Sequence, residues 1–280
     1  MLTEYIWQDA KGYIWIGTLS GFVRYDGFEF TPYLKGKQEN ILSFCPGVDG
    51  SVWALGFRCK HVVDKEGTIR TIPLTKRGLL LNNLNTYSLP PGLVLLEDEQ
   101  ERGREICRLT TEGVETVLKS SVLDSMDFCR RVYLDSVSQT FYIPTASHLC
   151  RIKADGTVLS PIQVTEPYSL LRNGTQLFLF GAEGIYEING DSTRLVASCR
   201  FLAPDYGVSA CADRKGNIFI HDAHNLYRFS KDGSVRRIVD GINLIRQMCI
   251  DREGNLWLAT YQGVYNFFQL NFMDHRLNDR

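Results

Sequence analysis

The sequence lacks the features that mark several large classes of protein. No apolar run approaches the ~18–20 residues that a membrane-spanning helix needs. The 280 residues include 31 basic and 32 acidic ones, mixed along the chain, for a formal net charge of −1. We therefore predict no direct membrane insertion, and the charge gives no electrostatic basis for binding nucleic acid.

Sequence signatures of common enzyme classes are also missing. The chain contains no G-x-S-x-G, no H-E-x-x-H and no glycine-rich phosphate loop, and none of its eight cysteines falls in a C-x-x-C pair. Several cysteines recur at equivalent strand positions, which favours buried thiols that fill space over metal ligands or a disulfide framework. We predict no catalytic residues, no cofactor, no metal site and no enzyme activity in this chain.

What the sequence does contain is a repeat. Residues 9–18 read D-x-x-G-x-Φ-W-Φ-small-T, where Φ is an apolar residue, and residues 251–260 repeat this pattern. Weaker copies begin at Val48, Pro91, Asp135 and Arg172, and another strong copy begins at Asp213. An Asp and a Gly at this spacing suit a tight hairpin, and the apolar run that follows predicts a buried strand.

A second pattern, Φ-x-Arg-Φ or a variant of it, follows each copy of the first. Successive occurrences are separated by 36 to 45 residues. A period of ~40–45 residues with four strands per repeat is typical of a β-propeller. We therefore predict an all-β fold, a seven-bladed β-propeller with four-stranded antiparallel blades, as a single domain over residues 1–280. The predicted blades span residues 3–35, 39–76, 84–119, 127–164, 166–198, 204–240 and 242–275.

The tryptophans and aspartates of the repeat are predicted to be structural. The tryptophans are Trp15, Trp53 and Trp257, and the hairpin aspartates are Asp9, Asp49, Asp213 and Asp251. Equivalent positions in apolar strands indicate that the tryptophans pack in the core. The aspartates occur one per blade without partner carboxylates for calcium, so we expect them to cap turns. In each repeat the strands follow one another from the inner to the outer one, so we expect ring closure to need an outer strand from before Met1.

Propellers usually bind ligands on the face formed by the loops between second and third strands and between blades. The repeat register places these polar and aromatic residues there: Arg58, Lys60, His61, His148, Tyr206, His224, Tyr261 and Gln262. Such side chains can hold a polar ligand by hydrogen bonds and ring stacking, and the cationic ones favour an anionic ligand. His221 and His224 are close enough to begin a metal site, but strand alternation separates them, so we expect loop contacts instead.

The strong copies resemble the two-component regulator propeller repeat, which reads Q-D-x-x-G-x-(I/L)-W-(I/L)-G-T and continues into a Φ-x-R-Y-D strand. Residues 8–18 with 21–26 match it closely, and residues 250–260 with 263–267 match too. The third to fifth units lack the Trp and the Gly-Thr. The resemblance implies the sensor region of a Bacteroidetes-type hybrid histidine kinase, which binds an oligosaccharide and signals to an output domain outside this chain.

The same resemblance implies a location and partners. The chain would be a fragment of a longer sensor, periplasmic as part of an inner-membrane protein, in contact with other domains of its parent and open to forming a homodimer. A cytoplasmic location is the alternative, because Met1–Glu4 runs into a predicted strand without a signal peptide. Two other functions stay open: a protein-interaction scaffold, and a lyase or glycan-active propeller enzyme. The lyase-like enzyme would use His148, His224 and Asp222 on one face.

Overall fold

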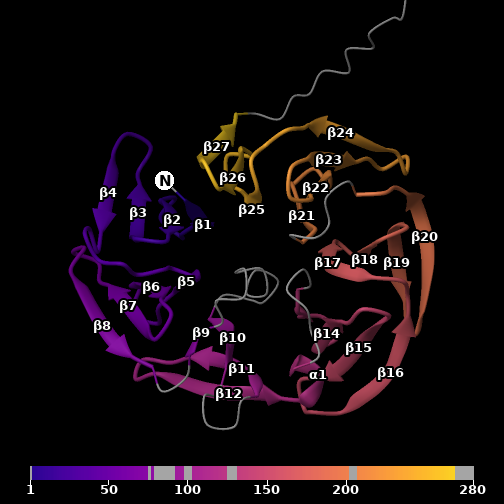
Figure 1. The fold of residues 1–280 in the computed structure, drawn as a ribbon, viewed down its shortest axis with the longest axis horizontal. Helices are drawn as coiled ribbons and strands as arrows, with labels where there is room; N and C mark the ends of the chain where they lie inside the picture. The colour runs from indigo at the N-terminus through magenta and orange to yellow at the C-terminus, as the bar shows by residue number, and fades with distance from the viewer. Residues whose placement is uncertain are drawn as a thin grey trace, which may run out of the picture.

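The computed structural model is a ring of seven antiparallel sheets (Figure 1). The structure describes residues 2–74, 77–78, 92–97, 103–124, 131–201 and 207–268. Six sheets have four described strands and one has three. The predicted all-β, seven-bladed propeller with four-stranded blades is confirmed.

The strands of each blade run in chain order from the inner strand to the outer one. Blades one to three contain β1 (Thr3–Gln8), β2 (Ile14–Thr18), β3 (Gly21–Tyr25), β4 (Phe30–Tyr33); β5 (Ser43–Pro46), β6 (Val52–Leu55), β7 (Cys59–Val63), β8 (Ile69–Pro73); β9 (Arg77–Gly78), β10 (Leu93–Glu97), β11 (Arg104–Leu109), β12 (Val114–Lys119). Blades four and five contain β13 (Tyr133–Asp135), β14 (Thr140–Pro144), β15 (His148–Lys153), β16 (Val158–Gln163); β17 (Pro167–Asn173), β18 (Gln176–Gly181), β19 (Gly184–Asn189), β20 (Ser192–Ser198). Blades six and seven contain β21 (Ser209–Ala212), β22 (Ile218–His221), β23 (Leu226–Phe229), β24 (Val235–Val239); β25 (Ile245–Ile250), β26 (Leu256–Thr260), β27 (Gly263–Phe267).

In the third blade, the inner strand β9 lies ahead of the expected blade start at residue 84, in a repeat too degenerate to mark its inner strand. One short helix, α1 (Ser121–Asp124), occurs in the described part of the chain. No helix of these described residues is long and apolar enough to cross a membrane.

The hairpin aspartates cap their turns as predicted. One oxygen of Asp9 accepts hydrogen bonds from two backbone N–H groups of its hairpin, and the other accepts the indole N–H of Trp15 at 2.8 Å. In the seventh blade, the Asp251 carboxylate also accepts an indole N–H at 2.8 Å, from Trp257. In the first and seventh blades, a carboxylate–indole bond therefore ties the hairpin to the strand after it.

In the second blade, Asp49 is not the counterpart of Asp9, contrary to the alignment of the repeats. The backbone N–H of Gly47 donates to the Ser51 carbonyl, the bond that Asp9 makes in the first blade. Asp49 instead accepts a hydrogen bond from the Ser51 hydroxyl, and Trp53 donates its indole N–H to that hydroxyl at 2.9 Å. The turn is capped, but the link to the tryptophan runs through a serine.

The core lies between neighbouring blades. The three predicted core tryptophans are buried, which confirms their structural role. The second strands β2, β14 and β26 are buried along their whole length, because each blade packs against a neighbour on both faces. No disulfide joins the seven described cysteines. Cys211 and Cys249 stand opposite Phe219 and Trp257 in their hairpins, as their repeat positions predict.

The first and seventh blades close the ring through side chains. The Arg246 guanidinium lies 2.9 Å from the Glu4 carboxylate, and both side chains are less than a tenth exposed. Thr3 Oγ1 donates to the carbonyl of Thr260 at 2.8 Å. We expected closure to need a strand from before Met1; within the described residues, these contacts and a shared apolar cluster make it.

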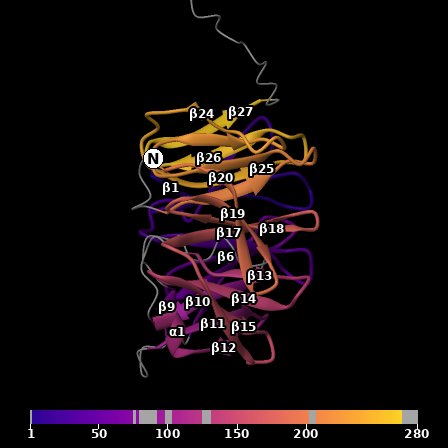
Figure 2. The ribbon, with the colours of Figure 1, turned by 90° about the vertical axis from the view of Figure 1, so that its right-hand side faces the viewer.

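Antiparallel pairing gives the ring two faces, one on each side of the disc seen edge-on in Figure 2. The loops between second and third strands and the blade-to-blade connections share one face, which we call the connection face. The hairpins between first and second strands and the turns between third and fourth strands share the other, the hairpin face.

Candidate functional site

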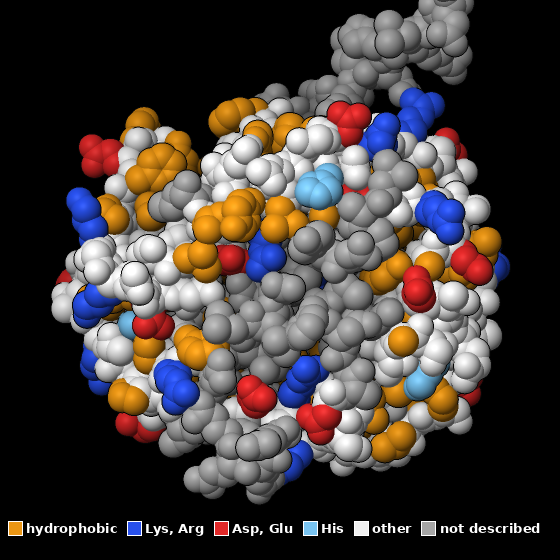
Figure 3. Space-filling model, viewed as in Figure 1, with side chains coloured by type: hydrophobic (Ala, Val, Ile, Leu, Met, Phe, Trp, Pro, Cys, Tyr) orange, Lys and Arg blue, Asp and Glu red, His pale blue; other side chains and the backbone are white. Residues whose placement is uncertain are grey.

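The structure spreads the predicted ligand-contacting residues around the connection face. Arg58, Lys60 and His61 belong to the second blade, His148 to the fourth, His224 to the sixth, and Tyr261 and Gln262 to the seventh. Tyr206 lies outside the described residues. Figure 3 shows histidine side chains at separate places on this face rather than in one group. A single ligand site on this face can therefore include only some of the predicted residues.

Lys60 serves the structure of the ring. Its side chain is buried, with the ammonium 4.0 Å from the centre of the Trp53 ring. The ammonium donates to the carbonyls of Thr110 and Thr111 in the third blade. Burial lowers the pKa of Lys60. The hydrogen bonds of the Lys60 ammonium link the second blade to the third. Arg58, just before β7, is exposed.

His224, Tyr261 and Gln262 come together, and we call them the seventh-blade patch. They meet at the connection between β24 and β25. His224 Nδ1 lies 2.9 Å from the carbonyl oxygen of Ile242. The backbone N–H of Tyr261 donates to the carbonyl of Asn243 at 3.2 Å. The Tyr261 side chain is 50% exposed, and Gln262 beside it is also exposed.

His148 stands alone in the fourth blade. Its Nδ1 lies 3.2 Å from the Thr145 hydroxyl and 3.0 Å from the Ser147 hydroxyl. These bonds hold the half-buried ring against its own loop. None of the other predicted site residues takes part in these bonds.

The Asp222 carboxylate is hydrogen-bonded to its own loop and to strand β23. It accepts hydrogen bonds from the Tyr227 hydroxyl at 2.7 Å, the Asn225 amide at 2.9 Å and the His224 backbone N–H at 3.0 Å. Burial acts to raise the pKa of Asp222, but these bonds outweigh it and lower the pKa. These bonds indicate that Asp222 stabilises the local structure, since a catalytic acid or base must be within hydrogen-bond reach of its substrate.

His221 is fully buried below the same loop. Its Nε2 lies 3.1 Å from the Ser209 hydroxyl and its Nδ1 lies 3.0 Å from the Asp222 carbonyl. Burial, together with the charge of Arg131, lowers the pKa of His221 to about 3. The ring is neutral at pH 7. His221 thus bonds Ser209 of strand β21 inside the blade, and only His224 makes the expected loop contact, with Ile242.

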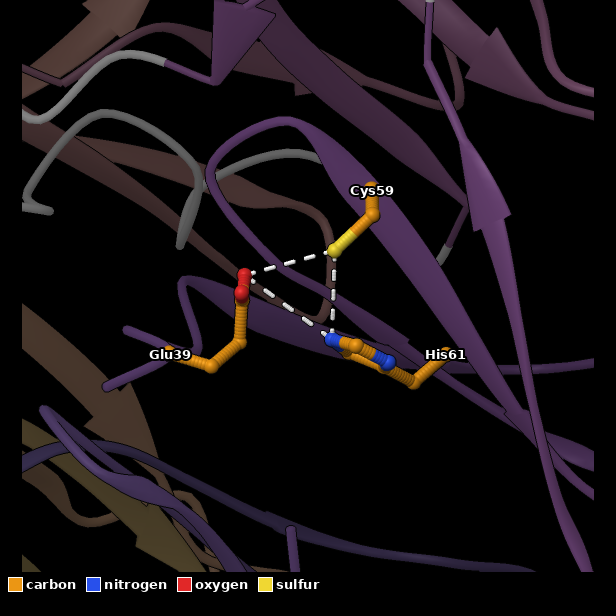
Figure 4. A group of neighbouring side chains, drawn as sticks. All are labelled: Glu39, Cys59 and His61. Atoms are coloured by element: carbon orange, nitrogen blue, oxygen red, sulfur yellow. Dashed lines mark hydrogen bonds and ion pairs between the residues drawn. The ribbon is translucent and has the colours of Figure 1, made fainter. Parts of the chain in front are cut away.

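Sequence reasoning missed a cluster in the second blade, drawn in Figure 4. Cys59 Sγ lies 3.3 Å from the Glu39 carboxylate and 3.2 Å from His61 Nε2, and that nitrogen lies 3.8 Å from the same carboxylate. Cys59 and His61 are two residues apart in β7, so they point to one side of the strand. Glu39 reaches them from the connection between β4 and β5. Only the C-x-H spacing was readable in the sequence.

Burial dominates the electrostatics of this cluster. It raises the pKa of the Cys59 thiol to about 12, with the Glu39 carboxylate adding to the effect. It lowers the pKa of His61, and Glu39 opposes this effect only in part. The cluster therefore holds a protonated thiol and a neutral imidazole at pH 7.

A cavity opens on the hairpin face, away from the predicted residues. It lies between the fifth and sixth blades and has a volume of ≈ 640 Å³. Asn173, Arg194 and Lys231 supply polar lining, and Phe178 and Phe229 supply apolar lining. The sequence pattern gave no sign of it, because its walls come from two blades and the repeat does not encode contacts between blades.

Comparison with known proteins finds a family model that matches part of the seventh blade. Residues 241–262, which include β25, its hairpin and β26, match the family model for the two component regulator propeller. The match covers one repeat unit, in the seventh blade. The resemblance seen in the sequence is confirmed at this blade. No curated protein sequence matches the chain significantly.

Solved structures resemble the whole ring. The extracellular domain of a protein described as a hybrid two component system of B. thetaiotaomicron has a TM-score of 0.66 and 16% identity, over 95% of this chain and 38% of its own. A second such domain has a TM-score of 0.62 and 14% identity, over 95% and 39%. Virginiamycin B lyase of Staphylococcus aureus has a TM-score of 0.66 and 15% identity, over 94% and 93%. At these identities the likeness shows the propeller fold.

Proposed function

We propose that this ring is the ligand-sensing module of a two-component signalling protein and that its ligand is an oligosaccharide. The observation that carries the proposal is the family repeat in the seventh blade. The fold shared over 95% of the chain with extracellular domains of two-component systems supports it. The ring is then one periplasmic domain of a longer parent, which supplies the output domain and further partners, a second copy among them.

The seventh-blade patch is the part of the predicted site best suited to a sugar. The half-exposed ring of Tyr261 offers a flat surface for the C–H face of a pyranose, and the Gln262 amide and the His224 imidazole offer groups for its hydroxyls. The backbone of Tyr261 is held by the connection between β24 and β25. A surface held in place before binding loses less entropy when a ligand is bound.

The lyase alternative is weaker on geometry. Of its three predicted residues, Asp222 has its carboxylate filled by loop hydrogen bonds, and His148 and His224 lie in different blades. The likeness to virginiamycin B lyase is a likeness of fold. The scaffold alternative uses the same face, and a binding experiment separates it from sugar sensing.

Signal transfer then works between domains. A ring whose blades are tied by buried contacts has little freedom to change shape inside. Ligand bound on the connection face shifts the way in which a neighbouring domain or protomer docks there, because it binds one docked arrangement more tightly than another.

The test is titration of the purified chain with neutral and acidic oligosaccharides, followed by calorimetry and by thermal unfolding. We expect saturable binding that raises the unfolding temperature with ligand concentration. Tyr261→Ala should weaken binding roughly ten-fold or more, as truncation of a central aromatic contact does. Phe28→Ala is the matched control, since Phe28 is an exposed aromatic residue, 93% exposed, in a turn on the hairpin face.

The outcomes separate the alternatives. Binding that survives Tyr261→Ala but is lost in Arg194→Ala places the site in the hairpin-face cavity and overturns the seventh-blade patch. No binding across the panel overturns sugar sensing by this chain. A protein ligand that competes at Tyr261 while sugars do not bind favours the scaffold.

A further inference from the structure

We propose that Glu39, Cys59 and His61 form a binding site for a divalent transition metal ion, with zinc as the natural occupant. The site belongs to the second blade and is separate from the seventh-blade patch. Three donor atoms of different kinds, a carboxylate oxygen, a thiol sulfur and an imidazole nitrogen, face one another there (Figure 4).

The spacing of the donor atoms fits tetrahedral coordination. Bonds of about 2.0–2.3 Å to zinc at the tetrahedral angle place neighbouring donors about 3.3–3.6 Å apart. The observed separations are 3.2 Å between sulfur and nitrogen, 3.3 Å between sulfur and oxygen and 3.8 Å between nitrogen and oxygen. A metal ion therefore fits with shifts of a few tenths of an ångström.

The donors are held in orientations that suit a metal. His61 Nδ1 lies 2.9 Å from the Thr71 hydroxyl, which leaves Nε2 turned toward Glu39 and Cys59. The backbone N–H of Phe57 donates to the Glu39 carboxylate at 3.2 Å. The Thr71 contact lies on the far side of the imidazole from the other donors, and bonds of this kind fix ligand orientation in metal sites, whereas Phe57 binds the same Glu39 oxygen that faces Cys59 and His61.

The chemistry of the donors selects the ion. A thiolate and an imidazole suit zinc and its neighbours in the first transition row, whereas calcium and magnesium take oxygen donors. Three protein ligands leave the fourth position to water or to an incoming donor. The Glu39 side chain is 24% exposed, so the cluster is reached from solvent. Coordination takes the thiolate form of Cys59, whose proton passes to solvent as the metal binds.

The bound ion would tie the blade-to-blade connection that carries Glu39 to strand β7. Without metal, that tie consists of one thiol hydrogen bond and one long carboxylate–imidazole contact. The metal thus fixes a connection on the face where we expect a ligand or a neighbouring domain to dock.

Cobalt is the probe for the test, because a cobalt–thiolate bond gives a charge-transfer band in the near ultraviolet that other donors do not give. We expect the full chain to bind one Co²⁺ with this band, and Zn²⁺ to displace it in competition. Cys59→Ser should abolish the band and weaken Zn²⁺ binding at least roughly 100-fold, more than the loss of a second-layer partner would. Cys150→Ser is the matched control, since Cys150 is a half-buried strand cysteine in the fourth blade.

Two further variants test the geometry without removing a donor. A Cβ at Gly56 would lie 2.1 Å from the Glu39 carboxylate oxygen and 3.1 Å from Cys59 Sγ, so Gly56→Ala must displace Glu39. Thr71→Val removes the hydroxyl that holds His61. Each should weaken Zn²⁺ binding roughly ten-fold or more, the usual cost of disturbing the support of a ligand. Near-ultraviolet circular dichroism of the metal-free variants checks that they remain folded.

The proposal is overturned if the chain gives no cobalt–thiolate band, if the band survives Cys59→Ser, or if Cys150→Ser weakens binding as much. It is supported if the band depends on Cys59 alone and the affinity falls in Gly56→Ala and Thr71→Val.

Discussion

The first and fourth blades place an aspartate at the same point of the hairpin and use it differently. Asp9 binds the indole of Trp15 within its own blade at 2.8 Å. In the fourth blade Phe141 takes the place of that tryptophan, and both oxygens of Asp135 bind Arg172 of the fifth blade, at 2.6 and 2.8 Å. The repeat thus keeps its carboxylate when it loses its tryptophan, and the bond moves from inside a blade to the interface between blades.

The closure of the ring uses a carboxylate–guanidinium pair as well, in a more buried setting. Both members of the Glu4–Arg246 pair are less than a tenth exposed, whereas Arg172 is 21% exposed. Breaking a buried pair leaves an unpaired charge in a medium of low dielectric constant, so the cost rises with burial. The loss of stability on breaking each pair should therefore follow the order of burial.

The largest effect is expected for Arg246→Met. The substitution removes the Arg246 cation from beside the buried Glu4 carboxylate, and the free energy of unfolding should fall by about 3–5 kcal/mol. Urea unfolding at pH 7 measures it. The double variant with Glu4→Met is the control, because replacing both charges by apolar groups should restore much of the loss. A loss below about 1 kcal/mol in the single variant would contradict a structural role for the pair in closure.

A smaller loss is expected for Asp135→Asn. Arg172 keeps part of its hydration when its partner loses charge, so the free energy of unfolding should fall by roughly 2–3 kcal/mol. The control is Asp155→Asn, in an exposed turn, where we expect little change. Equal effects in the two variants would show that Asp135 does no more than cap its hairpin.

The pH dependence of the same site gives an independent measure. Burial acts to raise the pKa of Asp135, but hydrogen bonds from Arg172 and Ser138 outweigh it and lower the pKa from 3.8 to about 2. A carboxylate with a lowered folded pKa contributes stability above its unfolded pKa and loses it as pH falls through the folded value. The stability difference between wild type and Asp135→Asn should therefore hold at pH 5 and shrink toward about pH 2, as denaturation midpoints across this range would show. A constant difference would contradict the assignment.

The carboxylate–indole bond is tested by a pair of hairpins. Asp9→Asn weakens a bond to Trp15 at a buried position, and we expect a loss of about 1–2 kcal/mol. Asp213 caps the sixth-blade hairpin through Asn217 in place of a tryptophan and is more exposed. Asp213→Asn should cost less than about 1 kcal/mol. Equal losses, measured by urea unfolding, would show that the indole adds nothing to the cap.

The contacts described above differ in how well the sequence predicts them. Hairpins, third strands and core tryptophans follow from local rules of turn geometry and apolar patterning, so they were predicted even where the repeat is weak. Asp49 was misaligned because an Asp-Gly dipeptide two residues along the hairpin imitates the true turn position, which Gly47 fills. The error is local and leaves the fold unchanged.

The candidate sites depend on contacts between units that the repeat does not encode. Lys60 looked like a loop cation, but its long side chain reaches carbonyl groups of the next blade and is buried there. Glu39 lies in a connection without periodicity, so nothing in the sequence places it against His61. The repeat predicts the strands of each blade. Contacts between blades, which it does not encode, determine which loop side chains are buried and which can meet a ligand.

The smallest effect is expected at an exposed pair of the same chemistry. Arg194 binds Glu187 on the outer strands of the fifth blade, with the arginine side chain 66% exposed. Solvent screens the charges and the flexible side chain loses entropy when it is held, so Arg194→Ala should cost no more than about 0.5 kcal/mol in urea unfolding. Arg194, Arg172 and Arg246 thus belong to three carboxylate–guanidinium pairs that differ in burial. A loss at Arg194 as large as that at Arg246 would mean that hydrogen-bond geometry, and not burial, sets the strength of these contacts.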